Sequence, residues 1–133
     1  MHFKGIDLNL IKRIYILAAI LMALAVMIGA FGAHGLKEIV TGKYIETYKT
    51  GVTYHFYHAL GIFLVGILSQ LNPQLNFKKV GILFLIGILL FSVNCYLYAI
   101  TQIKTFAMIV PIGGVSFILG WLLLAKSLLG IKK

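Results

Sequence analysis

Four uninterrupted apolar runs constrain this chain more than any other feature of its sequence. They cover residues 14–31, 54–71, 80–100 and 106–125, and none of them contains a charged side chain. Each run approaches the roughly 20 residues that a helix needs to cross about 30 Å of hydrocarbon. Apolar and polar residues do not alternate along the runs, so helices rather than barrel strands must satisfy the backbone. The sequence therefore predicts an all-α transmembrane four-helix bundle, with residues 1–133 in a single domain.

The composition agrees with a membrane protein and argues against other classes. Hydrophobic residues make up 61% of the 133 residues, more than a soluble domain of this size could bury. The net charge of +9 could suggest a nucleic-acid partner, but the basic residues lie at the ends of apolar runs instead of along one face. The single cysteine, Cys95, leaves no internal disulfide framework. We therefore expect the lipid bilayer, and no nucleic acid, as the surroundings of this chain.

The lysine and arginine residues predict the orientation of the chain. With four spans, the two termini and the second loop share one side, and the first and third loops share the other. The first side carries Lys4, Lys12, Arg13, Lys78, Lys79, Lys126, Lys132 and Lys133, and the second carries Lys37, Lys43, Lys49 and Lys104. Because basic residues concentrate on the cytoplasmic side, we expect a multi-pass protein of the plasma membrane with both termini in the cytoplasm. The first run is longer than the apolar region of a usual signal peptide, so we expect it to stay uncleaved.

The first loop, residues 37–53, contains a second helical pattern. Apolar residues recur there every four positions, and charged residues on the opposite side can pair at three-residue spacing. The former are Val40, Tyr44, Tyr48 and Val52, and the latter are Lys43, Glu46 and Lys49. This pattern predicts a short interfacial amphipathic helix on the membrane surface, broken near Gly42, and the alternative is a lid over a pocket.

Small residues recur toward the end of the first run. Ala25, Gly29 and Ala33 lie four residues apart, and this spacing lets another helix approach closely. The predicted helix-packing residues are Ala25, Gly29, Gly32, Ala33 and Gly35, and Gly35 is also expected to end the helix in the left-handed conformation. The pattern predicts assembly through the first helix, as a homo-oligomer or with a membrane-protein partner.

Polar residues gather toward the expected outer ends of the spans. His34 follows shortly after the first run, His55 and His58 share a face of the second helix, and Asn94 lies in the outer third of the third span. Because polar groups in a membrane tend to face a bundle interior or a wet cavity, these four residues predict an outward-facing polar cup. The alternative is that they bond one another and helix ends as structural contacts.

The sequence PIGG lies at the same depth in the fourth span. Proline lacks a backbone donor, and glycine neighbours weaken the helix further. Pro111, Gly113 and Gly114 therefore predict a kink in the fourth helix, or the start of its regular part.

Three classes of function remain open at this point. The leading expectation is a non-enzymatic protein without a cofactor, because no acid accompanies the serines inside the spans as a catalytic triad requires. A small transporter or carrier subunit is the second, although only a histidine could supply its embedded ionisable group. The third is a metal- or haem-binding protein that uses His34, His55 and His58 as ligands.

Two stretches together resemble a known family. They are GAFGAHGLKE, which follows the alanine-rich first run, and TYHFYHALGIFLVGIL in the second. With them the whole chain is similar to the YgdD/YwdK-like family of small four-helix bacterial membrane proteins, which carries a domain of unknown function. The resemblance places the family's motifs at residues 29–35 and 54–60 and implies a bacterial plasma-membrane protein with no catalytic residue to transfer. The second motif varies near its first histidine in that family, which favours His34 and His58 over His55 as functional residues.

Overall fold

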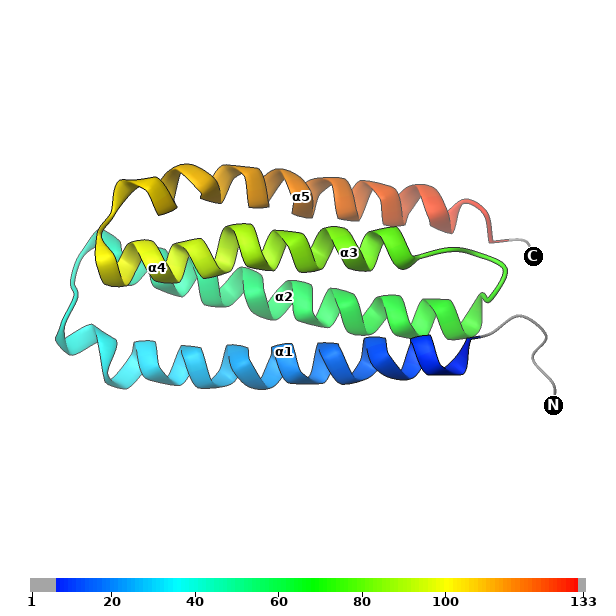
Figure 1. The fold of residues 1–133 in the computed structure, drawn as a ribbon, viewed down its shortest axis with the longest axis horizontal. Coiled ribbons are helices and arrows are strands. Elements are labelled where there is room, and N and C mark those ends of the chain that lie inside the picture. Colours follow the sequence, from blue (N-terminus) through cyan, green and yellow to red (C-terminus); the bar gives the residue numbers. More distant parts are fainter. Residues whose placement is uncertain (1–6, 132–133) are drawn as a thin grey trace.

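The computed structural model describes residues 7–131, which form a bundle of four helical spans (Figure 1). The first span is α1 (Leu8–His34), followed by the short 3-10 helix η1 (Leu36–Glu38), and the second is α2 (Lys43–Leu71). The third span joins α3 (Lys78–Gly87), the π-helical segment η2 (Ile88–Ser92) and α4 (Val93–Thr101), and the fourth is α5 (Lys104–Leu128). The predicted all-α bundle is confirmed, and each predicted span lies inside one of the observed ones.

The spans run antiparallel in succession, so α1 begins and α5 ends at the same end of the bundle (Figure 1). Helix α1 packs on α2, α2 also packs on the third span, and α5 packs on α3, η2 and α4. Lys4, Lys132 and Lys133, which contribute to the predicted orientation, lie outside the described residues. The arrangement fixes which loops share a side, and the orientation itself stays a prediction.

The expected surface helix of the first loop is not a separate element. Residues 43–53 instead form the first turns of α2, which continues without a break into the second span. The reason is that Tyr48 finds partners within the bundle: its hydroxyl donates to the carbonyl oxygen of Ile28 at 2.7 Å, and its ring lies 5.1 Å from that of Tyr96. Gly42, with φ 58°, precedes the helix and does not interrupt it. The apolar side of this segment therefore faces other helices, and neither a surface helix nor a lid forms.

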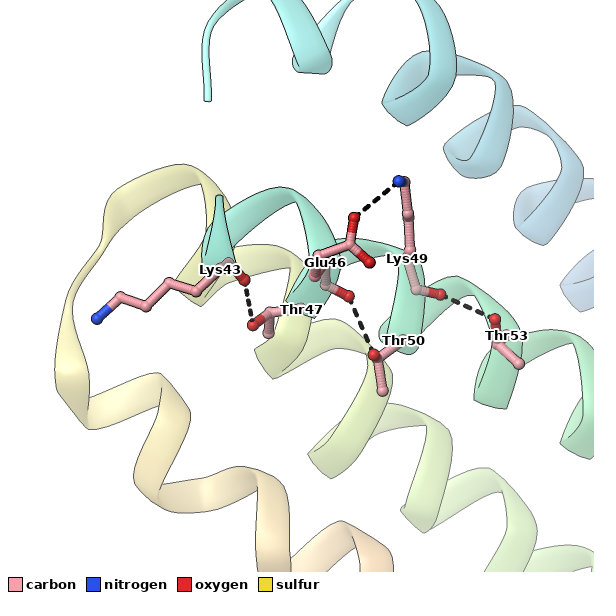
Figure 2. A network of polar contacts seen from close by, with 6 residues as sticks. All are labelled: Lys43, Glu46, Thr47, Lys49, Thr50 and Thr53. Carbon is pink, nitrogen blue, oxygen red and sulfur yellow. Dashed lines mark hydrogen bonds and ion pairs between the residues drawn. The ribbon is translucent and has the colours of Figure 1, made fainter. Parts of the chain in front are cut away.

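The opposite side of these first turns is polar, as Figure 2 shows. The predicted pairing at three-residue spacing is confirmed for Glu46 and Lys49, whose charged atoms lie 2.8 Å apart. The hydroxyls of Thr47, Thr50 and Thr53 each donate to the carbonyl oxygen four residues earlier in the helix. These bonds satisfy the hydroxyls locally, so this face needs no partner from another helix.

Two apolar clusters hold the bundle together. The larger one joins all four spans and contains Ala18, Leu21, Ala59, Ile62, Val65, Phe77, Val80, Phe84, Ile88, Phe117 and Leu124. The smaller one lies near the connection between α1 and α2 and contains Leu36, Val40, Tyr48, Tyr96 and Ala99. Much of α1 is exposed outside these clusters, as expected of a helix that faces lipid on most sides.

The small residues of α1 lie mostly against α2 of the same chain. Ala25 is buried, a Cβ atom at Gly29 would lie 3.2 Å from Val52, and one at Gly32 would lie 2.8 Å from Cδ1 of Tyr48, with Cε1 of that ring nearer still. Ala33 instead is exposed. Gly35 follows the last residue of α1 with φ −90°, so the expected left-handed ending is wrong, because the chain continues directly into η1.

The third and fourth spans meet closely at η2. In a π-helical segment hydrogen bonds reach five residues instead of four, which leaves carbonyl groups to be satisfied otherwise. The side-chain amide of Asn94 donates to the carbonyl oxygens of Leu89 at 3.1 Å and Leu90 at 3.0 Å. Gly113 of α5 lies directly against this segment. Helix α5 begins at Lys104, seven residues before Pro111, so the PIGG sequence does not start its regular part.

Candidate functional site: a groove between α2 and α5

The four residues of the predicted polar cup do not share one cavity. His34 is exposed at the end of α1, whereas His55, His58 and Asn94 are buried and hydrogen bonded to different groups. Over residues 7–131, no three His, Cys, Asp or Glu side chains lie where they could hold a metal ion together. The three histidines that were considered as metal or haem ligands are therefore separated.

Both ring nitrogens and one ring face of His58 have contacts within the bundle. Its Nδ1 lies 2.7 Å from the carbonyl oxygen of Tyr54, and the indole Nε1 of Trp121 donates to its Nε2 at 3.0 Å. Its ring also stacks on Phe117 with centroids 3.4 Å apart and an interplanar angle of 9°. Because a carbonyl oxygen only accepts hydrogen bonds, the network assigns the proton to Nδ1 and leaves Nε2 as the acceptor.

His55 lies one turn earlier and points elsewhere. Its Nδ1 lies 3.0 Å from the hydroxyl of Tyr96 on α4. Its Nε2 and the nearby hydroxyl of Ser92 are buried without a hydrogen-bond partner among the described side chains and backbone. This histidine therefore ties α2 to the third span and takes no part in the surroundings of His58.

A groove of about 570 Å³ runs between α2 and α5 on the side of His58. Its lining comes from three elements: Tyr54, Tyr57, His58 and Leu60 of α2, Phe91 of η2, and Gly114, Phe117, Ile118 and Trp121 of α5. This volume is within the range of small-molecule sites in proteins. Five of the nine lining residues are phenylalanine, tyrosine or tryptophan, so the groove offers ring faces and edges where a lipid-facing surface normally offers aliphatic side chains.

The groove opens on the side of the bundle and lies within the spans. Tyr57, Leu60 and Ile118 on its walls are exposed, and all belong to segments long and apolar enough to cross a membrane. In a bilayer its mouth therefore faces hydrocarbon. The polar groups among its lining residues are the hydrogen-bonded pair Trp121 and His58 and the hydroxyls of two tyrosines.

Sequence reasoning found His58 but missed Phe117 and Trp121. The available signal was the chain's single tryptophan, which follows Phe117 at four-residue spacing in an otherwise aliphatic run. Residues four apart share a helix face, so the rings of Phe117 and Trp121 are expected on the same surface of α5. That this surface faces His58 depends on how α5 packs, which no local pattern contains.

Known proteins similar to this chain match most of its length and are named as membrane proteins. Residues 28–114 match a family model described as protein of unknown function DUF423. The UPF0382 membrane protein YwdK of Bacillus subtilis strain 168 is 44% identical over 117 residues, which cover 87% of this chain and 95% of that protein. A UPF0382 membrane protein of Staphylococcus saprophyticus is 44% identical over 113 residues, covering 85% and 93% of the two chains. One of Staphylococcus epidermidis is 41% identical over 118 residues, covering 89% and 96%.

No solved structure matches the chain. The resemblance inferred from the GAFGAHGLKE stretch is confirmed by the matches to curated relatives, which extend over most of both sequences. The relatives are bacterial membrane proteins by name, in agreement with the four spans observed between residues 7 and 131. The chain therefore belongs to the UPF0382 family of bacterial membrane proteins, whose domain is DUF423.

Proposed function

We propose that this protein is a non-enzymatic membrane protein that binds lipid-soluble molecules with a flat ring in the groove between α2 and α5. The observation that carries the proposal is the lining, in which five phenylalanine, tyrosine and tryptophan side chains surround a volume of about 570 Å³. Aromatic pairs gain about 0.5–1.5 kcal/mol beyond the burial of their area when rings stack or meet edge to face. A ring-bearing molecule gains this energy in the groove, and an acyl chain of the bulk lipid does not.

The groove walls are arranged to hold such a ring rather than to collapse. Tyr54 and Phe91 pack together with ring centroids 4.7 Å apart, and Phe91 lies 5.6 Å from Phe117. Gly114 supplies a stretch of wall without a side chain, where an added Cβ atom would have Phe91 as its nearest neighbour at 3.7 Å. The rings of Tyr54, Phe91 and Phe117 therefore contact one another, and the lack of a side chain at Gly114 leaves the space beside Phe91 open.

Binding, and not catalysis or transport, is the function that this lining supports. Among residues 7–131, the lining contains no carboxylate, serine or cysteine that could act as a nucleophile or an acid, and both ring nitrogens of its histidine are hydrogen bonded. A proton-coupled carrier needs an embedded ionisable group that is free to exchange its proton. Both ring nitrogens of His58 already have hydrogen-bond partners, so we do not extend the proposal to transport.

We also revise the expected mode of assembly. The small residues of α1 contact α2 of the same chain at Gly29 and Gly32, so this face is already occupied and we propose no homo-oligomer through it. The orientation remains part of the proposal: eight basic residues on the side of the termini against four on the other favour both termini in the cytoplasm.

The single tryptophan makes a direct binding experiment possible, because Trp121 lies in the groove wall. An alkylated bromonaphthalene, which quenches tryptophan only at contact, is titrated into lipid nanodiscs that contain the protein. We expect saturable quenching in the wild type, and its loss in Gly114→Phe, whose ring fills the groove. The matched control is Leu119→Phe, which adds the same ring at an exposed position of α5 outside the lining.

Quenching that rises linearly with probe concentration, or that is equal in the two phenylalanine variants, would contradict the proposal. Either result would mean that the probe meets Trp121 by diffusion in the bilayer and not in a defined site.

A further inference from the structure

The hydrogen bond between Trp121 and His58 makes the groove chemically selective. The indole N–H can only donate, and the Nε2 of His58 can only accept because the proton of this ring is held at Nδ1 by the carbonyl of Tyr54. The groove wall therefore presents one donor and one acceptor at neighbouring positions, 3.0 Å apart when they bond each other.

The two partners differ in how firmly they are held. His58 is 4% exposed and stacked on Phe117, and its second nitrogen is bonded to backbone, so two contacts besides Trp121 hold it in position. Trp121 is 41% exposed and packs on Phe84 with ring centroids 4.7 Å apart, so it is the less buried member of the pair. A ligand atom can therefore enter between them by displacing the indole, while the histidine lone pair stays in place.

A hydroxyl group matches this pair, because its oxygen accepts one hydrogen bond and its proton donates another. We infer that the groove recognises a ring bearing a hydroxyl group, as in a phenol or the hydroquinone form of a lipid, over the same ring with an ether or carbonyl oxygen. The hydroxyl accepts from the indole N–H of Trp121 and donates to Nε2 of His58. This inference rests on the proposed function and specifies the ligand of the same groove.

The alternatives leave one member of the pair unsatisfied. An ether or carbonyl oxygen can accept from the indole but offers no proton to Nε2 of His58, which then stays buried without a partner. A carboxylate or phosphate would lose its hydration without meeting a cation, because no lysine or arginine between residues 7 and 131 lines the groove. The cost of an unpaired buried acceptor corresponds to a preference for the hydroxyl of about tenfold in Kd.

The test compares an alkylated bromonaphthol with its methyl ether, which has the same ring and carries a methyl group in place of the hydroxyl proton. Each is titrated against Trp121 quenching in nanodiscs, and each Kd is corrected for the measured partition of the probe into protein-free nanodiscs. We expect the naphthol to bind about tenfold tighter than the ether in the wild type. The preference should disappear in His58→Phe, which keeps a ring against Phe117 but has no lone pair.

The matched control is His34→Phe, which removes a histidine from the exposed end of α1 and should keep the full preference. The wild type offers a second readout that does not depend on any variant. Its single tryptophan gives one indole signal in a proton–nitrogen NMR spectrum. Saturating naphthol should shift that signal differently from saturating ether, because only the hydroxyl can accept from the indole and donate to Nε2 of His58 at the same time.

The outcomes separate this inference from the proposed function. Equal corrected affinities for naphthol and ether in the wild type, with saturable quenching by both, would overturn the hydroxyl preference and leave ring binding intact. A preference that survives in His58→Phe would also overturn it, since another group would then recognise the hydroxyl. Absence of saturable quenching by either probe would refute ring binding itself, and the inference with it.

Discussion

Two adjacent glycines of α5 give the sharpest test of how this bundle packs, because Gly113 and Gly114 face different surroundings. A Cβ atom at Gly113 would lie 2.7 Å from the carbonyl carbon of Leu90 and from the Cβ of Phe91, with the Phe91 amide nitrogen nearer still. A Cβ atom at Gly114 would have its nearest neighbour, the ring of Phe91, at 3.7 Å. Gly113→Ala must therefore displace main chain, whereas Gly114→Ala requires no displacement.

The expected free energies follow from these distances. To bring the 2.7 Å contacts at Gly113 to an ordinary separation of about 3.5 Å, α5 and η2 must move apart by nearly 1 Å. Overpacking costs about 1–3 kcal/mol, and we expect about 2–3 kcal/mol because main-chain atoms cannot rotate away. Gly114→Ala gains the helix propensity of alanine, up to about 1 kcal/mol. The two variants should differ by about 3 kcal/mol in the free energy of unfolding.

Reversible unfolding in mixed SDS and detergent micelles, followed by far-ultraviolet circular dichroism, measures this difference. Gly81→Ala is the control in the third span, since a Cβ atom there would meet only Val65, at an ordinary 3.5 Å. A Gly113→Ala protein as stable as Gly114→Ala would refute the close approach of α5 to η2. It would also remove the physical basis for placing Phe91 in the groove.

Four further results are expected. Tyr48→Phe removes the hydroxyl that bonds the Ile28 carbonyl of α1 and should lower the unfolding free energy by about 0.6–1.5 kcal/mol in the same assay. Asn94→Leu leaves two carbonyls of the π-helical segment without their side-chain donor and should cost about 1–3 kcal/mol; a wild-type melting curve would contradict this role. His34→Ala should change stability by less than about 0.5 kcal/mol because the side chain is exposed, whereas His58→Ala, which opens a buried gap, should cost several times more. A reporter fused to the C-terminus should be active in the cytoplasm, and external activity would reverse the orientation.

The spans could be predicted from sequence, but not where the helices begin. Apolar runs without charge have few alternatives in a membrane, so the four spans follow from local composition. Helix α2 starts at Lys43 instead of Tyr54, and this start depends on Tyr48. From sequence, Tyr48 is expected in an amphipathic surface helix. Its burial against Gly32 and its bond to the Ile28 carbonyl are long-range contacts. An amphipathic pattern shows that one face is covered, and it does not say whether lipid or another helix covers it.

The histidines show a related limit, because sequence gives their depth better than their direction. His55 and His58 are three residues apart, which at about 100° per residue separates their directions by about 60°. That angle is enough to point one side chain at Tyr96 of α4 and the other at Trp121 of α5. His34, predicted at the same depth, lies at the exposed end of α1. Side chains that share a layer therefore form a common site only if the helices turn them toward one another.

The groove itself depends on a feature that no sequence pattern indicated, the π-helical segment η2. Phe91 belongs to this segment and lines the groove, while the amide of Asn94 satisfies the carbonyls of the two residues before Phe91. Gly113 allows α5 to approach the backbone of η2, and Gly114, one residue later, leaves open the space beside the ring of Phe91. The two glycines that suggested a kink thus act in opposite ways, one closing the contact between the spans and the other keeping the groove empty. A substitution at Gly114 can therefore change binding without changing the fold, and one at Gly113 cannot.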